Sequence, residues 1–402
     1  MACFAFSCKE NINNKFNTNK SNQSDIKTTH TKDPIIPGAN RLELYLPDLE
    51  GKKVGLVVNH TSRVGNQHLV DTLLHRNVNI HRIFSPEHGF KGEADAGEKV
   101  DNGLYKSIPV VSLYGKNRRP SKEQLQDLDV VIFDIQDVGV RFYTYISTLS
   151  YVMEEAAKND VEVIVLDRPN PNGYFIDGPL LEKEYASFIG LHNVPVVYGM
   201  TIGEYAKMVL GEGWIGENTS LNLEVIPCKN YDHTMTYNLP VKPSPNLPNL
   251  RSILLYPSLC YFEGSNLSIG RGTNNQFQVI GHPSLSSQSY SFMPKPNDGA
   301  SIPKLNGKTC YGVDLTNLSA ENIISKREID FSYLFEFYKE MKEKNESFFI
   351  ENNFFEKLIG TNSLRSALEN NISEEDWKNS WKDDLKVFRE IRNRYLMYND
   401  FE

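Results

Sequence analysis

The chain has 402 residues, of which 40% are hydrophobic and 23% are charged, and its formal net charge at pH 7 is −8. This length is enough for two domains, each with its own core, and the composition is that of an ordinary soluble protein. The negative net charge, together with the lack of a basic patch in the sequence, argues against a nucleic-acid-binding protein.

The first eight residues, MACFAFSC, look like the end of a bacterial lipoprotein signal in which Cys8 carries the lipid. A basic region is missing and the apolar run is short, and a start codon placed too far downstream explains both. An apolar N-terminus without a role is the alternative. Residues 9–38 are rich in Asn, Lys, Ser and Thr, which is typical of a disordered tether. We therefore expect residues 1–40 to be a signal remnant and tether, and the protein to be lipid-anchored in the periplasm or on the cell surface.

From residue 42 onward, short apolar strands alternate with helices. The predicted strands are residues 54–58, 78–84, 109–113, 130–133 and 161–166. The predicted helices are residues 68–75, a short one after Ser121, residues 147–158 and residues 201–210. This alternation predicts an α/β fold with a Rossmann-like, doubly wound parallel sheet. No G-x-G-x-x-G follows the first strand, so we expect neither a nucleotide nor another cofactor.

Four of the five predicted strands end in loops with many polar and charged side chains. The four loops are NHTS at 59–62, SPEHGF at 85–90, DIQDVGVRFYTY at 134–145 and DRPNPNG at 167–173. Parallel strands bring their carboxyl ends to one edge of the sheet, where open α/β sheets bind ligands. These loops therefore predict a site at that edge.

The SPEHGF loop places a carboxylate, an imidazole and a glycine turn together, as Glu87, His88 and Gly89. Such groups transfer protons. Phe84 and Phe90 flank the loop, and apolar neighbours would raise the pKa of Glu87 toward that of a working acid. A solvated turn without chemistry is the alternative reading.

A second domain is predicted after the proline-rich stretch KPSPNLP, residues 242–248. We expect a catalytic domain at residues 41–245 and a C-terminal domain at residues 246–402 that completes a cleft. Within the latter, Glu263, Asn266 and Arg271 lie among glycines, as in a tight loop that approaches a ligand, with a glycine-rich hairpin as the alternative. Trp377 and Trp381, four residues apart, are expected to be core residues, with a platform for a sugar ring as the alternative.

The five cysteines are Cys3, Cys8, Cys228, Cys260 and Cys310. They show no C-x-x-C pair and no zinc-ligand spacing. We expect the three in the body of the chain to be buried free thiols, and we expect no metal site.

An ordered set of stretches carries a family resemblance. The stretches are VNHTS, FSPEHGF, FDIQDVGVRFYTY, DRPNPNG, YGMTIGE, PSPNLP and FEGSNLSIGRGT. Together they resemble the exo-β-N-acetylmuramidase family, the NamZ-type glycosidases of glycoside hydrolase family 171. The resemblance implies a Rossmann-like domain, a smaller C-terminal α/β domain and an active cleft between them. It also implies release of N-acetylmuramic acid from the non-reducing ends of peptidoglycan fragments during cell-wall turnover, with peptidoglycan-derived muramyl saccharides as partners.

A glycosidase needs an acid to protonate the leaving oxygen and a second group at the oxocarbenium-like centre. Glu87 is the predicted acid, with His88 beside it. The second role stays open between Asp134 or Asp137, as nucleophile or base, and the 2-acetamido group of the substrate.

The lactyl ether of N-acetylmuramic acid carries a carboxylate, which a planar guanidinium can bind with two hydrogen bonds. Arg141 and Arg271 are the two candidates for this contact. The remaining candidate binders of hydroxyl and amide groups are Asn59, His60, Gln136, Tyr143, Asn170, Glu263 and Asn266.

Three other functions deserve comparison. A metal-dependent hydrolase could use His60, His88 and Asp134, but H-x-x-x-H and H-E-x-x-H spacings are absent. A serine esterase needs a G-x-S-x-G motif, which the chain lacks. A non-catalytic lipoprotein could hold cell-wall fragments in the same cleft.

Overall fold

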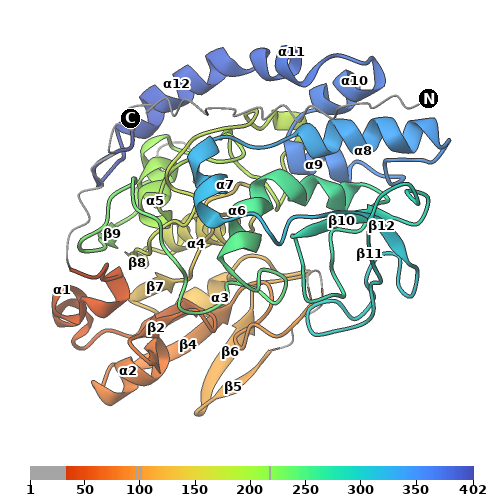
Figure 1. Ribbon diagram of the computed structural model, residues 1–402. Helices are drawn as coiled ribbons and strands as arrows, with labels where there is room; N and C mark the ends of the chain where they lie inside the picture. Colours follow the sequence, from red (N-terminus) through yellow and green to blue (C-terminus); the bar gives the residue numbers. More distant parts are fainter. Residues whose placement is uncertain (1–32, 96–97, 99–101, 217–218) are drawn as a thin grey trace, which may run out of the picture. The chain divides into compact units, whose positions relative to one another are not determined.

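A seven-stranded sheet forms the centre of the N-terminal half of the chain (Figure 1). The computed structural model describes residues 33–95, 98, 102–216 and 219–402. Cys3, Cys8 and residues 9–32 of the predicted tether lie outside the described residues, so the lipid anchor stays a prediction. The end of the predicted tether is wrong, because residues 36–40 pack on the folded part of the chain: Ile36 forms a bridge with Lys229, the N–H of Gly38 donates to the carbonyl oxygen of Asp167 over 2.8 Å, and Ala39 is fully buried.

The strand order in this sheet is β5-β6-β4-β1-β7-β8-β9. The strands are β1 (Val54–Val58), β4 (Ile80–Ser85), β5 (Gly103–Tyr105), β6 (Ile108–Ser112), β7 (Val130–Asp134), β8 (Glu162–Leu166) and β9 (Leu223–Ile226). All neighbours are parallel except β5 and β6, which are antiparallel. Numbered along the chain, the parallel strands have the order 3-2-1-4-5-6 of a Rossmann sheet. The predicted fold class is confirmed.

The apolar strands form because both faces of the sheet are covered, as in other parallel sheets. Successive side chains of a strand point to opposite faces, and β7 shows this clearly. Val131 and Phe133 belong to the larger core cluster, whereas Val130 and Ile132 belong to a second cluster on the other face. All four side chains are fully buried.

Two helices pack on the larger cluster. They are α4 (Tyr145–Lys158) and α5 (Ile202–Gly211). Thr201 and Glu204 form a capping box that fixes the start of α5. The other face carries α2 (Leu69–His75) and the short α1 (Leu42–Tyr45), whereas the short α3 (Lys122–Leu125) begins at the capping box of Ser121. The predicted helices therefore agree with the structure to within a few residues.

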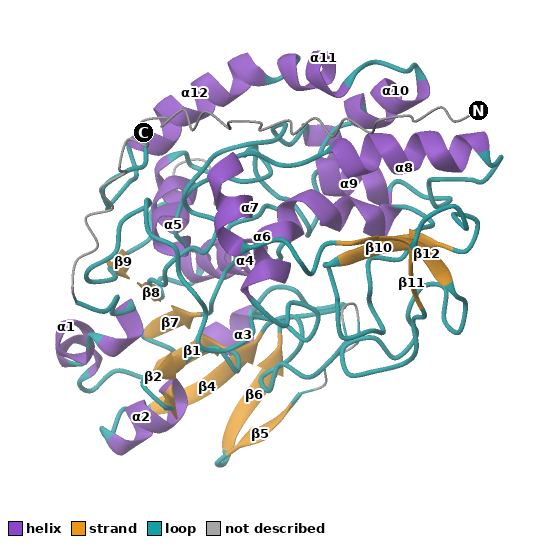
Figure 2. Cartoon of the chain, in the orientation of Figure 1, coloured by secondary structure: helices purple, strands orange, loops and turns teal. Residues whose placement is uncertain are grey.

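The C-terminal part combines a small antiparallel sheet with helices (Figure 2). Its strand order is β10-β12-β11, with β10 (Val279–His282), β11 (Tyr290–Phe292) and β12 (Cys310–Asp314). The helices are α6 (Leu250–Leu259), η4 (Cys260–Gly264), α7 (Ala320–Lys326), α8 (Ser332–Glu343), α9 (Phe354–Ile359), α10 (Ser363–Glu369), α11 (Glu374–Asn379) and α12 (Lys382–Asn393).

Three short 3-10 helices, η1 (Gly38–Asn40), η2 (Pro47–Leu49) and η3 (Lys183–Tyr185), and the hairpin of β2 (Arg63–Val64) and β3 (Gln67–His68) complete the described elements. None of the helices in the described ranges is long and apolar enough to cross a membrane.

One core cluster runs through both parts of the chain from Asp33 onward. It extends from the sheet to Trp377 and Trp381, which are buried as predicted, with ring centroids 5.8 Å apart. Cys228, Cys260 and Cys310 are buried free thiols, which confirms the expectation for the body of the chain. The domain boundary at residue 245 stays a prediction.

Candidate active site

A cavity of about 1010 Å³ lies between the carboxyl ends of the central strands and the C-terminal part. The sheet contributes the loop after β4 and the segment before α4, with Glu87, His88, Phe142, Tyr143, Thr144 and Tyr145. The C-terminal part contributes Tyr256, Cys260, Glu263, Arg271, Phe277 and Lys304. A cavity of this size can hold a sugar with room for its substituents.

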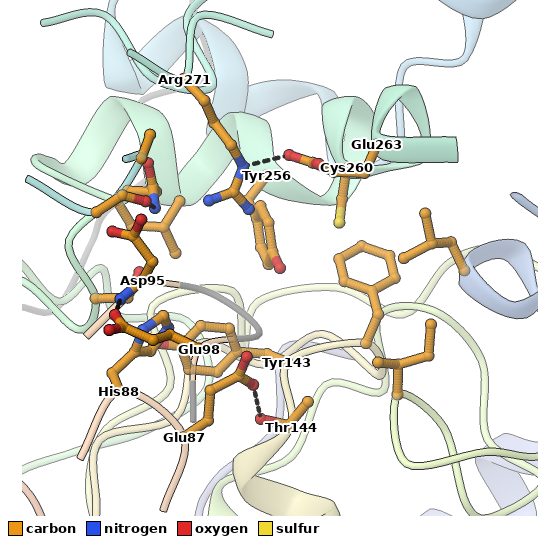
Figure 3. Close-up of a pocket in the computed structure, with 18 of the residues that line it drawn as sticks. Glu87, His88, Asp95, Glu98, Tyr143, Thr144, Tyr256, Cys260, Glu263 and Arg271 are labelled. Atoms are coloured by element: carbon orange, nitrogen blue, oxygen red, sulfur yellow. Dashed lines mark hydrogen bonds and ion pairs between the residues drawn. The ribbon is translucent and has the colours of Figure 1, made fainter. Parts of the chain in front are cut away.

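Glu87 is held by the neighbouring loop. The Oγ1 of Thr144 donates a 2.7 Å hydrogen bond to Oε2 of Glu87 (Figure 3). Thr144 directly precedes α4, and both β4 and β7 pair with β1, so the loops that follow these strands meet at one edge of the sheet. The bond fixes the direction of a carboxyl group that lines the cavity.

The aromatic neighbours of Glu87 are not those expected from the sequence. Phe84 is fully buried in the core, and Phe90 packs on the rings of His68 and Tyr105, each 4.9 Å away. Neither phenylalanine lines the cavity. Their side chains point elsewhere because flanking positions in a strand and a turn do not share one face.

The backbone of His88 has a φ of +67°, a left-handed conformation that turns the loop at this point. The ring lines the cavity and is 8% exposed. Its Nδ1 lies 2.7 Å from the carbonyl oxygen of Ala94. A carbonyl oxygen only accepts, so Nδ1 carries a proton and the Nε2 of the neutral ring is an acceptor.

Two tyrosines link the sheet to the proline-rich segment predicted as a domain boundary. The hydroxyl of Tyr143 donates to the carbonyl oxygen of Pro243 over 2.9 Å, and Tyr145 approaches the same oxygen at 3.5 Å. Asn59 donates to the hydroxyl of Tyr145 over 3.0 Å. Burial raises the pKa of Tyr145, so its hydroxyl keeps its proton. The proline-rich segment is thus part of the wall of the cavity, to which it also contributes Asn246.

A charged cluster lies across the cavity from Glu87 (Figure 3). Arg271 pairs through Nε with Oε1 of Glu263. The Nζ of Lys304 donates to the carbonyl oxygens of Phe262 and Glu263, over 2.9 and 3.4 Å, and to that of Ser265. Burial alone would raise the pKa of Glu263, but Arg271 and Lys304 hold it below its ordinary value. Two cations and one carboxylate leave a net positive charge, which suits an anionic group of a ligand.

Asp134 and Asp137, the predicted nucleophiles or bases, do not line the cavity. Asp134 is fully buried and accepts two hydrogen bonds from Arg168, of 2.6 and 2.9 Å. Asp137 accepts from the backbone N–H of Gly139 over 2.7 Å and from the hydroxyl of Tyr198. Burial raises the pKa of Asp137 to about 6. Their placement corrects the expectation that these carboxylates face the substrate.

Arg141 is likewise enclosed and does not reach the cavity. Its guanidinium donates to the carbonyl oxygens of Pro179 and Val194, over 2.8 and 2.7 Å, and to those of Leu358 and Ile359. Burial lowers the pKa of Arg141 to about 10. The side chain joins the segment before α5 to α9, so it is not available to a lactyl carboxylate.

The remaining predicted residues divide in the same way. Tyr143, Glu263 and Arg271 line the cavity, as do Glu87 and His88. The others do not line it and hold loops together, and these are Asn59, His60, Gln136, Asn170 and Asn266. Nowhere in the described ranges do three or more His, Cys, Asp or Glu side chains form a group able to hold a metal ion. His60, His88 and Asp134 are therefore not gathered as metal ligands.

Sequence reasoning missed several lining residues. Thr144 lies inside the stretch FDIQDVGVRFYTY, but nothing in the sequence indicates a role for its hydroxyl. Tyr256 and Lys304 come from a helix and a loop without a recognisable motif. No pattern in the sequence places Lys304 beside Glu263, because that contact joins positions 41 residues apart through the fold.

The cavity has the size of a sugar and is lined by a carboxyl group, an imidazole and tyrosines, with a cationic wall opposite. These features are typical of a glycoside hydrolase. Family models lead to the same class. Residues 54–251 match the N-terminal domain of the exo-β-N-acetylmuramidase NamZ, and residues 254–398 match its C-terminal domain. The chain belongs to the NamZ family of exo-β-N-acetylmuramidases.

One relative is the peptidoglycan β-N-acetylmuramidase NamZ of Bacillus subtilis (strain 168), 36% identical over 413 residues that cover 95% of this chain and 96% of the relative. Two solved structures of DUF1343 family proteins from Bacteroides fragilis NCTC 9343 share the fold. The first has a TM-score of 0.83 at 43% identity and covers 92% of this chain and all of that chain. The second has a TM-score of 0.75 at 29% identity, with 91% and 99% covered.

Proposed function

We propose that this chain is an exo-acting glycoside hydrolase that releases N-acetylmuramic acid from the non-reducing ends of peptidoglycan fragments in cell-wall turnover. The relative from Bacillus subtilis bears the name of this activity. The observation that carries the proposal is the carboxyl group of Glu87, which Thr144 orients in a cavity whose opposite wall is cationic.

Glu87 is the general acid in this proposal. Its proton passes to the glycosidic oxygen while the bond from that oxygen to C1 of the sugar breaks. A hydroxyl group from water is finally added to C1, and the second proton of that water returns to Glu87. His88, with an acceptor nitrogen in the same cavity, is placed to receive a hydrogen bond from a sugar hydroxyl or from water.

The second catalytic role belongs to a group that reaches the cavity. Asp134 and Asp137 do not reach it. In this proposal either the 2-acetamido group of the substrate takes the role, or the carboxylate of Asp95 or Glu98, both of which line the cavity.

In this proposal Arg271 binds the lactyl carboxylate of the substrate. One of its nitrogens is paired with Glu263, and the guanidinium extends into the cavity near Tyr256 (Figure 3). The charge of Lys304 nearby adds to the attraction for an anion. A substrate without the lactyl group, such as an N-acetylglucosamine glycoside, would leave this cationic wall without an anionic partner.

The direct test is turnover of a chromogenic N-acetylmuramic acid β-glycoside beside its N-acetylglucosamine analogue. We expect release of the aryl group from the first substrate and much slower release from the second. Binding of muramyl fragments without any turnover would instead favour the non-catalytic lipoprotein.

We also propose that the protein works outside the cytoplasm, anchored by a lipid on Cys8. Support comes from the apolar start followed by Ser7-Cys8 and a polar tether. The test is metabolic labelling with a palmitate analogue, using the gene with its upstream codons restored. Label that persists in Cys8→Ser, or that never appears, would refute the anchor.

A further inference from the structure

One side of the cavity carries a lip that the chemistry at Glu87 does not use. It is formed by the loop after β6, the turn at residues 187–190 and helix α9. Its members at the cavity are Arg118, Phe188, Ile189, Lys357 and Leu358. This group is called the outer lip below.

The parts of the outer lip are held firmly together. The guanidinium of Arg118 lies over the ring of Phe188, 4.4 Å from its centroid, and that ring stacks on Tyr151 at 5.9 Å. The buried Arg141 lies under the turn and donates to the carbonyl oxygen of Leu358 over 3.4 Å. Arg118 is therefore positioned before any ligand arrives, which lowers the entropic cost of binding.

Arg118 and Lys357 are exposed, and no ion pair joins either of them to a carboxylate of the described residues. The carboxylates of the same cavity have partners of their own. Asp95 accepts from the backbone N–H of Ser301 over 2.6 Å, and Glu98 accepts from that of Asp95 over 2.8 Å. In a chain with a net charge of −8, the outer lip offers two cations to an anionic ligand.

The lining of the cavity changes from enclosed to open. Around Arg271, the side chains of Tyr256, Cys260 and Phe277 are 8%, 3% and 1% exposed. By contrast, Arg118 and Lys357 of the outer lip are exposed. An exo-acting enzyme holds the terminal sugar in the enclosed part, so the rest of the chain must leave through the open part.

We propose that the outer lip is a binding site for the leaving part of the glycan, in which Arg118 and Lys357 contact carboxylates on the second sugar beyond the bond that is cut. The inference rests on the proposed function. Peptidoglycan alternates two sugars, so that second sugar is again an N-acetylmuramic acid. Its carboxylate comes either from a free lactyl group or from an attached peptide.

The test compares kcat/KM for three substrates that end in the same terminal sugar: the aryl N-acetylmuramic acid glycoside, the disaccharide with N-acetylglucosamine, and the tetrasaccharide built from two such units. At low ionic strength, kcat/KM for the tetrasaccharide should be about three- to tenfold higher than for the disaccharide, because two exposed ion pairs contribute a gain of this size. The advantage should disappear in Arg118→Gln/Lys357→Gln and at high salt. The aryl glycoside, which has no second sugar, should react at unchanged rates.

The matched control is Lys116→Gln, which removes a charge from the same loop at a position that does not line the cavity. It should keep the advantage of the tetrasaccharide. Tetrasaccharides with an amidated lactyl group, and with a peptide on the second muramic acid, separate the two sources of the carboxylate. The inference would be overturned if a tetrasaccharide with an amidated lactyl group and no peptide still had a higher kcat/KM than the disaccharide.

Two further outcomes would also overturn it. One is equal rates for di- and tetrasaccharide in the unaltered protein. The other is an equal loss on all three substrates in the double variant, which would place the two cations at the terminal sugar. In both cases the enzyme is still a muramidase, whereas a protein inactive on every substrate would refute the proposed function together with the outer-lip site.

Discussion

Thr144 and Glu87, 57 residues apart in sequence, are joined by a 2.7 Å hydrogen bond across the carboxyl ends of β7 and β4. Thr144 stands at the start of α4, so the packing of this helix on the sheet determines where the carboxyl group of Glu87 is held. A side chain that is held by a second residue reaches its working geometry without reorganisation.

Thr144→Val keeps the shape of the side chain and removes its hydroxyl. We expect kcat to fall about tenfold, the size of one hydrogen bond of roughly 1.4 kcal/mol, with little change in KM. Steady-state kinetics of Thr144→Val, Glu87→Gln and the double variant measure the coupling. Additive losses would show that Thr144 does not act through Glu87.

Arg271→Gln should remove the preference for muramic acid over N-acetylglucosamine. Loss of a charge-assisted contact in an enclosed site costs about 2–4 kcal/mol, so the ratio of kcat/KM for the two aryl glycosides should fall at least thirtyfold. Arg271→Lys, which keeps the charge without the planar fork, should retain part of it. An unchanged ratio in Arg271→Gln would mean that another group reads the lactyl carboxylate.

Arg141→Met tests whether the other predicted arginine stabilises the fold and does not bind the substrate. Four carbonyl oxygens lose their donor, so we expect a decrease of about 2–4 kcal/mol in the free energy of unfolding by urea. The preference for muramic acid should stay that of the unaltered protein. A stable variant with altered preference would place Arg141 at the substrate after all.

A comparison of Asp137→Asn with the unaltered protein should show how the buried carboxyl group of Asp137 changes the free energy of unfolding with pH. The pKa of Asp137 is raised from 3.8 to about 6 in the folded state. The folded state therefore binds more protons between these values, and the unaltered protein loses stability as pH rises from about 4 to about 6. The asparagine cannot titrate, so the variant should gain relative stability over this range, by at most about 3 kcal/mol. Urea unfolding at several pH values measures the difference, and a difference independent of pH would contradict this account of Asp137.

The fold was predictable because its signals are local. Runs such as Val130–Phe133 are apolar at every position, and a run of this kind is typical of a strand covered on both faces. The site was predictable only in part. The position of Glu87 after a strand placed it at the sheet edge, but nothing in the sequence separates an arginine that faces the cavity from one that binds carbonyl oxygens.

Arg141 and Arg271 illustrate this difference. Both lie in loops that carry the family resemblance, and both have the chemistry to bind a carboxylate. Their roles differ because Arg141 meets carbonyl groups from residues 38 to 218 positions away, and these contacts arise only when the chain folds. Asp134 and Asp137 were misplaced for the same reason, since their partners Arg168 and Tyr198 come from other loops.

The central claim is that Glu87 is the general acid, and Glu87→Gln tests it most directly, because glutamine keeps the shape and lacks the transferable proton. On a natural disaccharide, whose leaving group is poor, we predict that kcat falls about 10²–10⁴-fold, the usual contribution of general acid–base catalysis. With an activated aryl leaving group, which needs little protonation, the loss should be much smaller. Equal losses on both substrates, or a rate close to that of the unaltered protein on the disaccharide, would contradict the assignment.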